Sequence, residues 1–339
     1  MNEPIVFPFY FPTTVMFVDD NASFLMNLSL QFDGNIAHRL FSSPVDALIE
    51  VNATGHPTSQ ANDFFSHHAD SDDLSFSRQL IGLNLDEIHR LANDERRFAE
   101  VSVIVVDYAM PEMNGLDFLK NLKNRNIKRV LLTGIADEKI AVKAFNEGLI
   151  DRFVLKSAQS TLTSLNALIV ELQNLYFEQA GEILNKALAV GTLRFLHDPA
   201  FAKVFNTLCR ENQIVEYYLC NNPDGMLMLD AQGNMSRLVV YSDTDLQAQI
   251  EIAQEQGAPK AMIEVLRGGK VPYFPDSRGY YHPGQTNWED YLYPANILQG
   301  KQRYYYALAK LPSMSGRDAV LSYAAFLNLL DEHNSQEEL

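Results

Sequence analysis

The chain has 339 residues, which is enough for two domains of ordinary size that each bury a core. Hydrophobic residues make up 47% of it, but no stretch reaches the roughly 20 uninterrupted apolar residues of a membrane helix, so we expect no membrane association. A net charge of −16, from 27 Lys and Arg against 43 Asp and Glu, argues against nucleic acid as a partner.

Two further features favour a cytoplasmic location. The N-terminus lacks the basic region that begins a secretory signal. The two cysteines, Cys209 and Cys220, offer no framework for disulfides or for a zinc site.

Five short apolar runs in the first half predict buried parallel strands, and helical patterns lie between them. The runs cover residues 15–18, 36–41, 103–106, 130–132 and 153–155, and the helical patterns cover 22–32, 45–51, 116–122 and 138–145. Strands that alternate with helices predict an α/β domain with a doubly wound, five-stranded parallel sheet.

The segment from about residue 52 to 98 interrupts this alternation, so we interpret it as an insertion. Its first part is polar and acidic, and its second part, residues 83–98, has the spacing of an amphipathic helix. His67 and His68 lie near Asp70 and Asp72, but adjacent histidines in a polar loop are usually solvated, so we expect no metal there.

After residue 160 a helical stripe runs to about residue 188, and Asp198-Pro199 starts a helix that ends near residue 212. Packing against the sheet explains the stripe, and a coiled-coil dimer stalk is the alternative. Beyond Ile214, most of the fifteen tyrosines and the single tryptophan favour strands. Strands are predicted at 217–220, 226–229, 238–241, 270–274 and 304–311, and helices at 242–267, with a break at Pro259, and at 318–330.

These elements predict three parts. An N-terminal α/β domain spans residues 13–175 and contains the insertion, a helical linker spans 176–213, and a C-terminal α+β domain spans 214–339.

Four of the predicted strands end in polar residues of complementary chemistry: Asp19 with Asp20, Asp107, Thr133 and Lys156. Three carboxylates at one edge of a sheet repel one another, and a divalent cation relieves this; hard oxygen ligands suit Mg²⁺. A neighbouring carboxylate can then act as a nucleophile toward phosphorus and form an aspartyl phosphate. Lys156 offers a positive charge and Thr133 a hydroxyl for the same phosphoryl group.

These residues resemble the CheY-like receiver domain of two-component response regulators. The motifs Val18-Asp19-Asp20, Leu132-Thr133-Gly134 and Phe153-Val154-Leu155-Lys156, together with the run 106–115 around Asp107, occur in the family's order. The resemblance covers about residues 13–173 and implies a flavodoxin-like sheet.

The resemblance also implies roles for individual residues. Asp107 would be the phosphoacceptor, supplied by a sensor histidine kinase or a phosphotransfer protein. Mg²⁺ would be bound by Asp20, Asp107 and the backbone carbonyl of Ala109, with Asp19 acting through water. Thr133 and Phe153 would form the switch pair, and Lys156 would bind the phosphoryl group.

Two observations qualify this resemblance. Ser157 follows Lys156, where the family usually has a proline in a cis peptide bond. A haloacid-dehalogenase-like phosphatase also uses a nucleophilic aspartate, but it needs a second aspartate two residues later, where this chain has Ala109. We therefore expect no enzymatic turnover beyond self-catalysed phosphotransfer and slow autodephosphorylation.

The C-terminal part resembles an unassigned domain found in other bacterial response regulators, through residues 197–201, 216–219 and 230–234. One hypothesis is an interaction or ligand-sensing module, switched by homodimerisation or partner binding. The alternative is a nucleotide-binding effector, with phosphate at residues 267–270 and Arg278 and the base on Tyr273, Tyr280, Tyr281 or Trp288. A DNA-binding regulator is disfavoured because Lys and Arg are sparse over residues 182–212.

Overall fold

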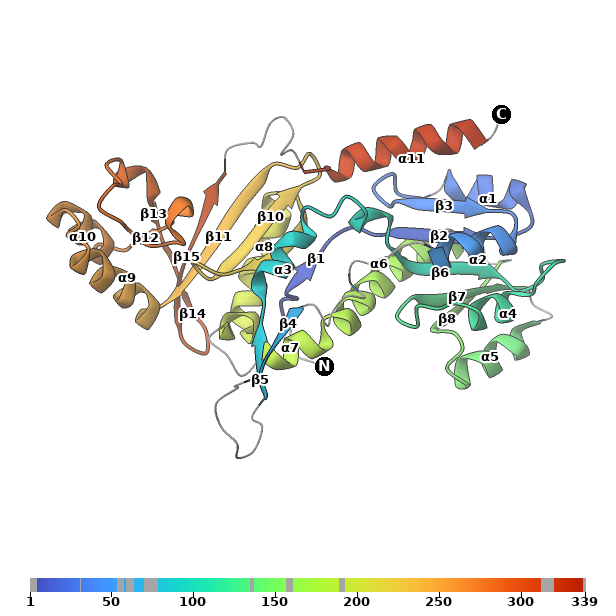
Figure 1. Ribbon diagram of the computed structural model, residues 1–339. Coiled ribbons are helices and arrows are strands. Elements are labelled where there is room, and N and C mark those ends of the chain that lie inside the picture. Colours follow the sequence, from blue (N-terminus) through green and yellow to red (C-terminus); the bar gives the residue numbers. More distant parts are fainter. Residues whose placement is uncertain are drawn as a thin grey trace. The chain divides into compact units, whose positions relative to one another are not determined.

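The computed structural model describes residues 5–30, 32–53, 58, 64–69, 79–134, 137–156, 161–188, 193–311 and 320–337. The chain forms two compact units, and each is built from separate stretches of sequence (Figure 1). Unit 1 comprises Met1–Tyr10, Ala61–Asn93 and Ile183–Ser322, and unit 2 comprises Phe11–Gln60, Asp94–Glu182 and Tyr323–Leu339.

Unit 2 contains a five-stranded parallel sheet in the order β3-β2-β6-β7-β8. The strands are β2 (Thr14–Val18), β3 (His38–Phe41), β6 (Val101–Asp107), β7 (Lys128–Thr133) and β8 (Arg152–Leu155). This confirms the predicted doubly wound, flavodoxin-like fold. Strands β2, β6 and β7 are buried along their whole length, because helices cover both faces of a parallel sheet.

Five helices cover this sheet: α1 (Ala22–Ser29), α2 (Pro44–Ala53), α4 (Gly115–Lys120), α5 (Glu138–Asn146) and α6 (Thr161–Ala180). Helices α2, α4 and α5 share one hydrophobic cluster with the sheet, whereas α1 and α6 share the other. The strand order reverses between β2 and β6, and open α/β sheets bind ligands beyond the carboxyl ends of the strands at such a point.

A last helix, α11 (Tyr323–Glu337), also belongs to unit 2. The Tyr323 hydroxyl donates to the carbonyl of Asn35 at 2.7 Å and accepts from the amide of Ala37 at 2.9 Å. The ring of Phe98 lies 5.2 Å from that of Tyr323 and 5.6 Å from that of Phe326. The sequence placed this helix in the predicted C-terminal domain, 214–339. In the structure it belongs to unit 2, because its contacts are with residues that lie far away in the sequence.

Unit 1 contains a six-stranded antiparallel sheet in the order β1-β9-β10-β11-β15-β14. Its strands are β1 (Phe9–Tyr10), β9 (Ile214–Cys220), β10 (Gly225–Asp230), β11 (Met235–Ser242), β14 (Asn296–Gln299) and β15 (Arg303–Lys310). A small pair, β12 (Lys270–Pro272) and β13 (Leu292–Pro294), lies beside it. The expected α+β fold of the C-terminal part is therefore present.

Between residues 182 and 322 the described residues form four α-helices: α7 (Glu182–Leu188), α8 (Pro199–Glu211), α9 (Asp243–Glu255) and α10 (Lys260–Arg267). Asp198 caps α8 by accepting from the amide of Ala200, as its position before a proline predicts. Ser242 and Asp245 form a capping box at the start of α9. The predicted break at Pro259 separates α9 from α10.

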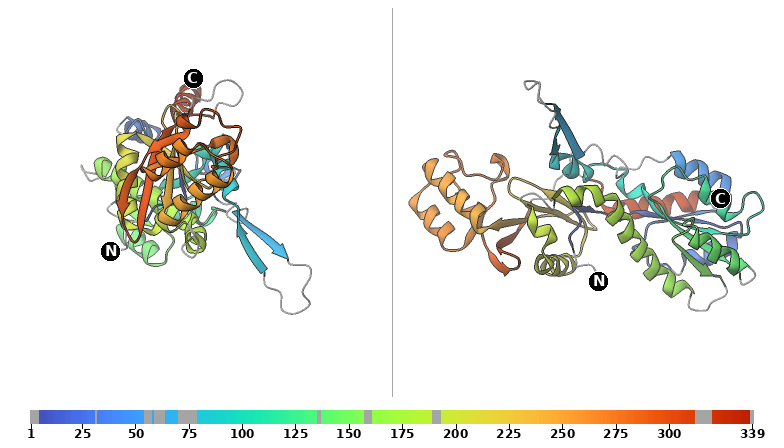
Figure 2. Two further views of the ribbon diagram at one scale, coloured as in Figure 1. Left: turned by 90° about the vertical axis from the view of Figure 1, so that its left-hand side faces the viewer. Right: turned by 90° about the horizontal axis from the view of Figure 1, so that it is seen from below.

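The segment predicted as an insertion contains an antiparallel pair, β4 (Phe65–Ala69) and β5 (Gln79–Leu83), and helix α3 (Leu85–Leu91). Figure 2 shows the β4–β5 pair projecting from unit 1. The backbone of His67 and His68 lies in β4, whereas Asp70 and Asp72 lie outside the described residues. Helix α3 packs against β9, so the structure places this part of the insertion in unit 1.

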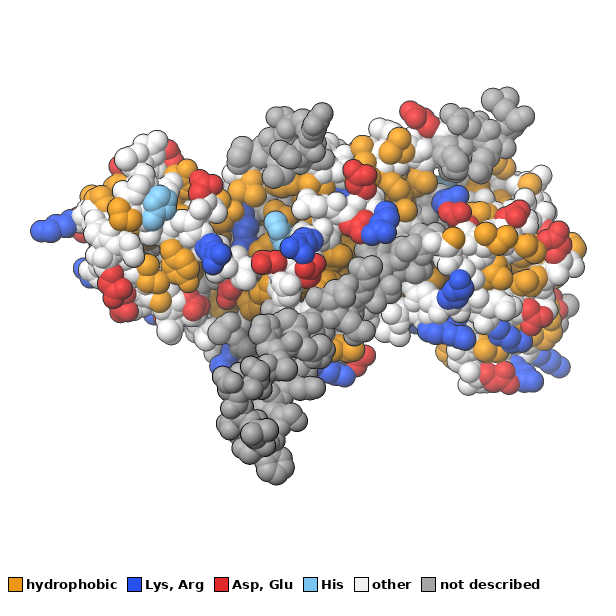
Figure 3. Space-filling model, in the orientation of Figure 1, with side chains coloured by type: hydrophobic (Ala, Val, Ile, Leu, Met, Phe, Trp, Pro, Cys, Tyr) orange, Lys and Arg blue, Asp and Glu red, His pale blue; other side chains and the backbone are white. Residues whose placement is uncertain are grey.

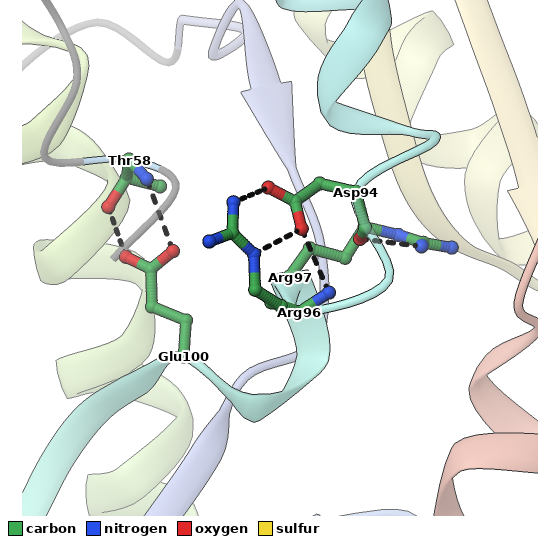
Figure 4. A network of polar contacts seen from close by, with 5 residues as sticks. All are labelled: Thr58, Asp94, Arg96, Arg97 and Glu100. Carbon is green, nitrogen blue, oxygen red and sulfur yellow. Dashed lines mark hydrogen bonds and ion pairs between the residues drawn. The ribbon is translucent and has the colours of Figure 1, made fainter. Parts of the chain in front are cut away.

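A buried polar cluster lies where the chain enters β6. Glu100 is fully buried and accepts from the amide of Thr58 at 3.2 Å and from the hydroxyl of Thr58 (Figure 4). It also accepts from the hydroxyl of Tyr176. Burial raises the pKa of the Glu100 carboxyl to about 7, although these hydrogen bonds act to lower it. Nearby, Arg96 pairs with Asp94 at 2.8 Å.

On the described part of the face drawn in Figure 3, Lys and Arg side chains are interspersed with Asp and Glu. The surface charge on that face therefore indicates no binding site. None of the described helices is long and apolar enough to cross a membrane.

Candidate functional site

Three acidic residues meet at the carboxyl edge of the parallel sheet in unit 2. Asp19 and Asp20 follow β2, and Asp107 is the last residue of β6. One carboxylate oxygen from each lies within 4.8 Å of the others. Asp19 and Asp107 are buried and Asp20 is exposed, so the group opens to solvent on one side.

Lys156 follows β8 and reaches into this acidic group. Its Nζ lies 2.6 Å from Oδ2 of Asp19 and 3.0 Å from Oδ1 of Asp107. Burial lowers the pKa of Lys156, but the hydrogen bonds to Asp19 and Asp107 outweigh burial, so the pKa is raised and the side chain stays an ammonium ion. Nζ also lies 4.8 Å from the ring centroid of Phe24 in α1, a contact that the sequence did not predict because Phe24 resembles any apolar helix residue.

The chemistry of the donors fits a hard divalent cation. Burial raises the pKa of Asp19, even though the amide of Asn21 donates to its Oδ1 at 3.0 Å and Lys156 pairs with Oδ2. Three carboxylates against one lysine leave a surplus of negative charge in a small volume. Oxygen donors of this kind, with room for water on the exposed side at Asp20 and Ala109, suit Mg²⁺.

The loop after β6 is fixed by close backbone contacts. The amide of Tyr108 donates to the carbonyl of Leu132 at 2.9 Å, and that of Gly115 donates to the carbonyl of Tyr108 at 3.0 Å. A Cβ atom at Gly115 would lie 2.3 Å from the carbonyl oxygen of Asp107, so only glycine fits there. Asn114 caps α4 by accepting from the amide of Asp117 at 3.0 Å.

The two predicted switch residues lie on β7 and β8, which follow β6 in the sheet. Thr133 ends β7 and is fully buried; its hydroxyl donates to the carbonyl of Gly134 at 3.1 Å, and its own carbonyl accepts from the amide of Lys156 at 3.0 Å. Phe153 in β8 is partly buried and packs against the cluster shared with α2, α4 and α5. Ser157 lies outside the described residues.

Comparisons with known proteins find similarity to response regulators. The model of the response regulator receiver domain matches residues 85–165. The solved response regulator LqsR of Legionella pneumophila has a TM-score of 0.74 and 36% sequence identity, and the alignment covers 97% of each chain.

Two curated relatives match over shorter stretches. A protein-glutamate methylesterase/protein-glutamine glutaminase of Treponema denticola is 37% identical over 109 residues, which is 28% of this chain and 29% of that protein. The hydrogenase transcriptional regulatory protein HoxA of Cupriavidus necator is 33% identical over 95 residues, 25% of this chain and 20% of that protein. The matches thus span less than a third of either relative's length.

Proposed function

This chain belongs to the response regulators, and from that premise we propose that Asp107 accepts a phosphoryl group from a histidine kinase or a phosphotransfer protein. The observation that carries the proposal is the meeting of Asp19, Asp20 and Asp107 around Lys156 at the edge of the sheet. The group has a nucleophile, a set of oxygen ligands and a positive charge within reach of one another.

In the proposed transfer, a carboxylate oxygen of Asp107 attacks phosphorus in phosphohistidine. A new O–P bond forms while the P–N bond breaks, and the histidine nitrogen keeps the bonding electron pair. Mg²⁺, bound by Asp20, Asp107 and the carbonyl of Ala109, with Asp19 acting through water, would offset the charge of the transferring group. Lys156 would exchange its ion pair with Asp107 for one with a phosphoryl oxygen.

The proposed switch follows from the new charge on Asp107. The Thr133 hydroxyl would turn from the carbonyl of Gly134 toward a phosphoryl oxygen, and the ring of Phe153 would move into the space behind it. Ala109 has no acidic group to assist hydrolysis, so the phosphoryl group would persist. We propose that the altered surface around Thr133 and Phe153 changes how the C-terminal output domain dimerises or binds a partner.

The test compares wild type with Asp107→Asn and with the control Asp117→Asn, a change in an exposed aspartate of α4 that pairs with Lys120. Each protein is incubated with acetyl phosphate and Mg²⁺, analysed on a phosphate-affinity gel, and measured by light scattering. Wild type and Asp117→Asn should be labelled, and Asp107→Asn should not; chelation of Mg²⁺ should prevent labelling. Equal labelling of Asp107→Asn and wild type would refute the assignment, whereas a doubled mass confined to labelled protein would favour dimerisation as the output.

A further inference from the structure

Unit 1 contains a cavity of ≈ 440 Å³ that combines basic and apolar side chains, a size typical of small-molecule sites. Its wall comes from separate elements of the unit. Helix α3 contributes His89, β11 contributes Arg237, and the turn after β12 contributes Arg278. Leu227, Tyr273 and Leu311 are among the apolar lining residues.

Arg237 is a buried cation that forms no ion pair within the described part of the chain. The residue is 4% exposed, and its side chain donates to the carbonyls of Asn221 at 3.3 Å, Leu238 at 3.2 Å and Pro223. None of the ion pairs formed among the described residues includes Arg237. Carbonyl groups accept from its N–H donors, its guanidinium lies 5.9 Å from the ring centroid of Tyr273, and it interacts electrostatically with Asp224 without forming an ion pair. A buried charge without an ion pair is costly.

Arg278 supplies a second free cation at the mouth of the cavity. It is exposed, and in the described part of the chain no hydrogen bond or ion pair engages its guanidinium. Its φ of 53° lies in the left-handed region, which is uncommon for a residue other than glycine. A Cβ atom at the following Gly279 would lie 2.7 Å from the backbone of Asn222 and Pro223, so close packing fixes this turn.

His89 also lines the cavity and is solvent-exposed. Partial burial and the charge of Arg237 lower the pKa of its imidazole, whereas the charge of Asp86 acts to raise it. Asp86 is the one acidic residue of the lining, and it is exposed at the start of α3. The lining therefore has two arginines against one aspartate, although the whole chain carries a net charge of −16.

We propose that this cavity binds a small organic anion, with its carboxylate or phosphate group between Arg237 and Arg278 and its apolar part against Tyr273, Leu227 and Leu311. Arginine suits such groups because its guanidinium can donate two parallel hydrogen bonds. Ligand binding here is independent of phosphotransfer to Asp107. The proposal also assigns a role to the inserted segment, because helix α3 forms one side of the cavity.

The cavity only partly matches the nucleotide site expected from the sequence. Tyr273 and Arg278 line it, whereas Arg267 and Lys270 do not. Tyr281 is buried in the cluster formed with α9 and α10. A nucleotide is thus one of several anions to compare.

Binding is measured on the full chain by thermal unfolding and by titration calorimetry. The probes are inorganic pyrophosphate, citrate and ATP at millimolar concentration, with adenosine as a neutral control. At least one anion should raise the unfolding temperature saturably, because it binds the folded state alone, and adenosine should not. Pyrophosphate and ATP without citrate would indicate a phosphate group, and citrate alone a carboxylate.

The matched variants are Arg278→Ala and Arg267→Ala, which each remove one basic side chain from unit 1. Loss of a charged hydrogen bond in Arg278→Ala should weaken binding by at least about tenfold. Arg267→Ala and Asp107→Asn should bind like wild type. Failure of every anion to bind wild type, or equal weakening by Arg267→Ala and Arg278→Ala, would overturn the proposal without affecting the assignment of Asp107.

Discussion

Lys156 pairs with two carboxylates, Asp19 and Asp107, so its positive charge stabilises the acidic site. Burial lowers the pKa of Lys156, but its hydrogen bonds to Asp19 and Asp107 raise it overall, so the side chain stays an ammonium ion. Asp19 loses solvation in the same place, and burial raises its pKa. The acids are therefore held together at a cost that an oxygen-binding cation would offset.

Glu100 should make the stability of the protein depend on pH. Its pKa is about 7 in the folded chain and 4.5 in a free side chain, so between these values only the folded state holds the proton. The free energy of unfolding should therefore fall as pH rises from about 4.5 to about 7, by up to about 3 kcal/mol from this residue. Urea unfolding at several pH values measures this slope.

The variant Glu100→Gln, which stays neutral, should lose this part of the slope. Glu171→Gln is the control, because Glu171 is an exposed glutamate that pairs with Arg152 at 2.7 Å. It should keep the slope of wild type. An unchanged slope in Glu100→Gln would show that Glu100 does not titrate in this range.

At the scale of elements, the start of α4 fixes the loop that carries Asp107. Gly115→Ala would push a methyl group against the carbonyl oxygen of Asp107. We expect the free energy of unfolding to fall by about 1–3 kcal/mol and phosphorylation of Asp107 to slow, because the loop must shift. Urea unfolding and the phosphate-affinity gel measure the two effects.

Gly34→Ala is the matched control, because a Cβ atom at Gly34 meets nothing within 4 Å. Its stability should be unchanged or raised by up to about 1 kcal/mol, since alanine restricts the unfolded chain. Similar losses in the two variants would mean that the contact with Asp107 is not the cause.

Many elements of both units were predictable because their signals are local. Most of the parallel strands of unit 2 contain a short apolar run. Helix ends are marked by Gly148 in unit 2 and by Asp198 and Ser242 in unit 1. Strand β1 has only two residues and β14 is mostly exposed, so neither has a periodic pattern. Both form because a neighbouring strand of the antiparallel sheet offers hydrogen bonds.

At the scale of the molecule, each unit includes a segment that is separated in the sequence from the rest of that unit. The inserted segment supplies α3 to unit 1, and the C-terminus supplies α11 to unit 2. Residues 92–100 connect α3 to β6, the strand that ends at Asp107. The chain therefore links helix α3, which lines the cavity, to the strand that ends at Asp107 through a short connection.

Tyr323→Phe tests whether α11 supports unit 2. The change removes the partner of the buried Ala37 amide and of the Asn35 carbonyl, so the free energy of unfolding should fall by about 1–3 kcal/mol. Hydrogen exchange at the Ala37 amide should become faster. Tyr280→Phe, at a tyrosine that is 39% exposed, should change neither quantity, and an equally protected Ala37 amide in Tyr323→Phe would contradict the expected role of α11.

The sequence by itself determined the α/β fold of the receiver and the residues of its acidic edge. This was possible because parallel strands end at the same edge of a sheet, so Asp19, Asp20, Asp107 and Lys156 had to lie near one another. Only the tertiary structure decided where α3 and α11 pack, and that Arg237 is buried without an ion pair to another described residue. Those features depend on contacts between distant residues, for which spacing along the chain gives no signal.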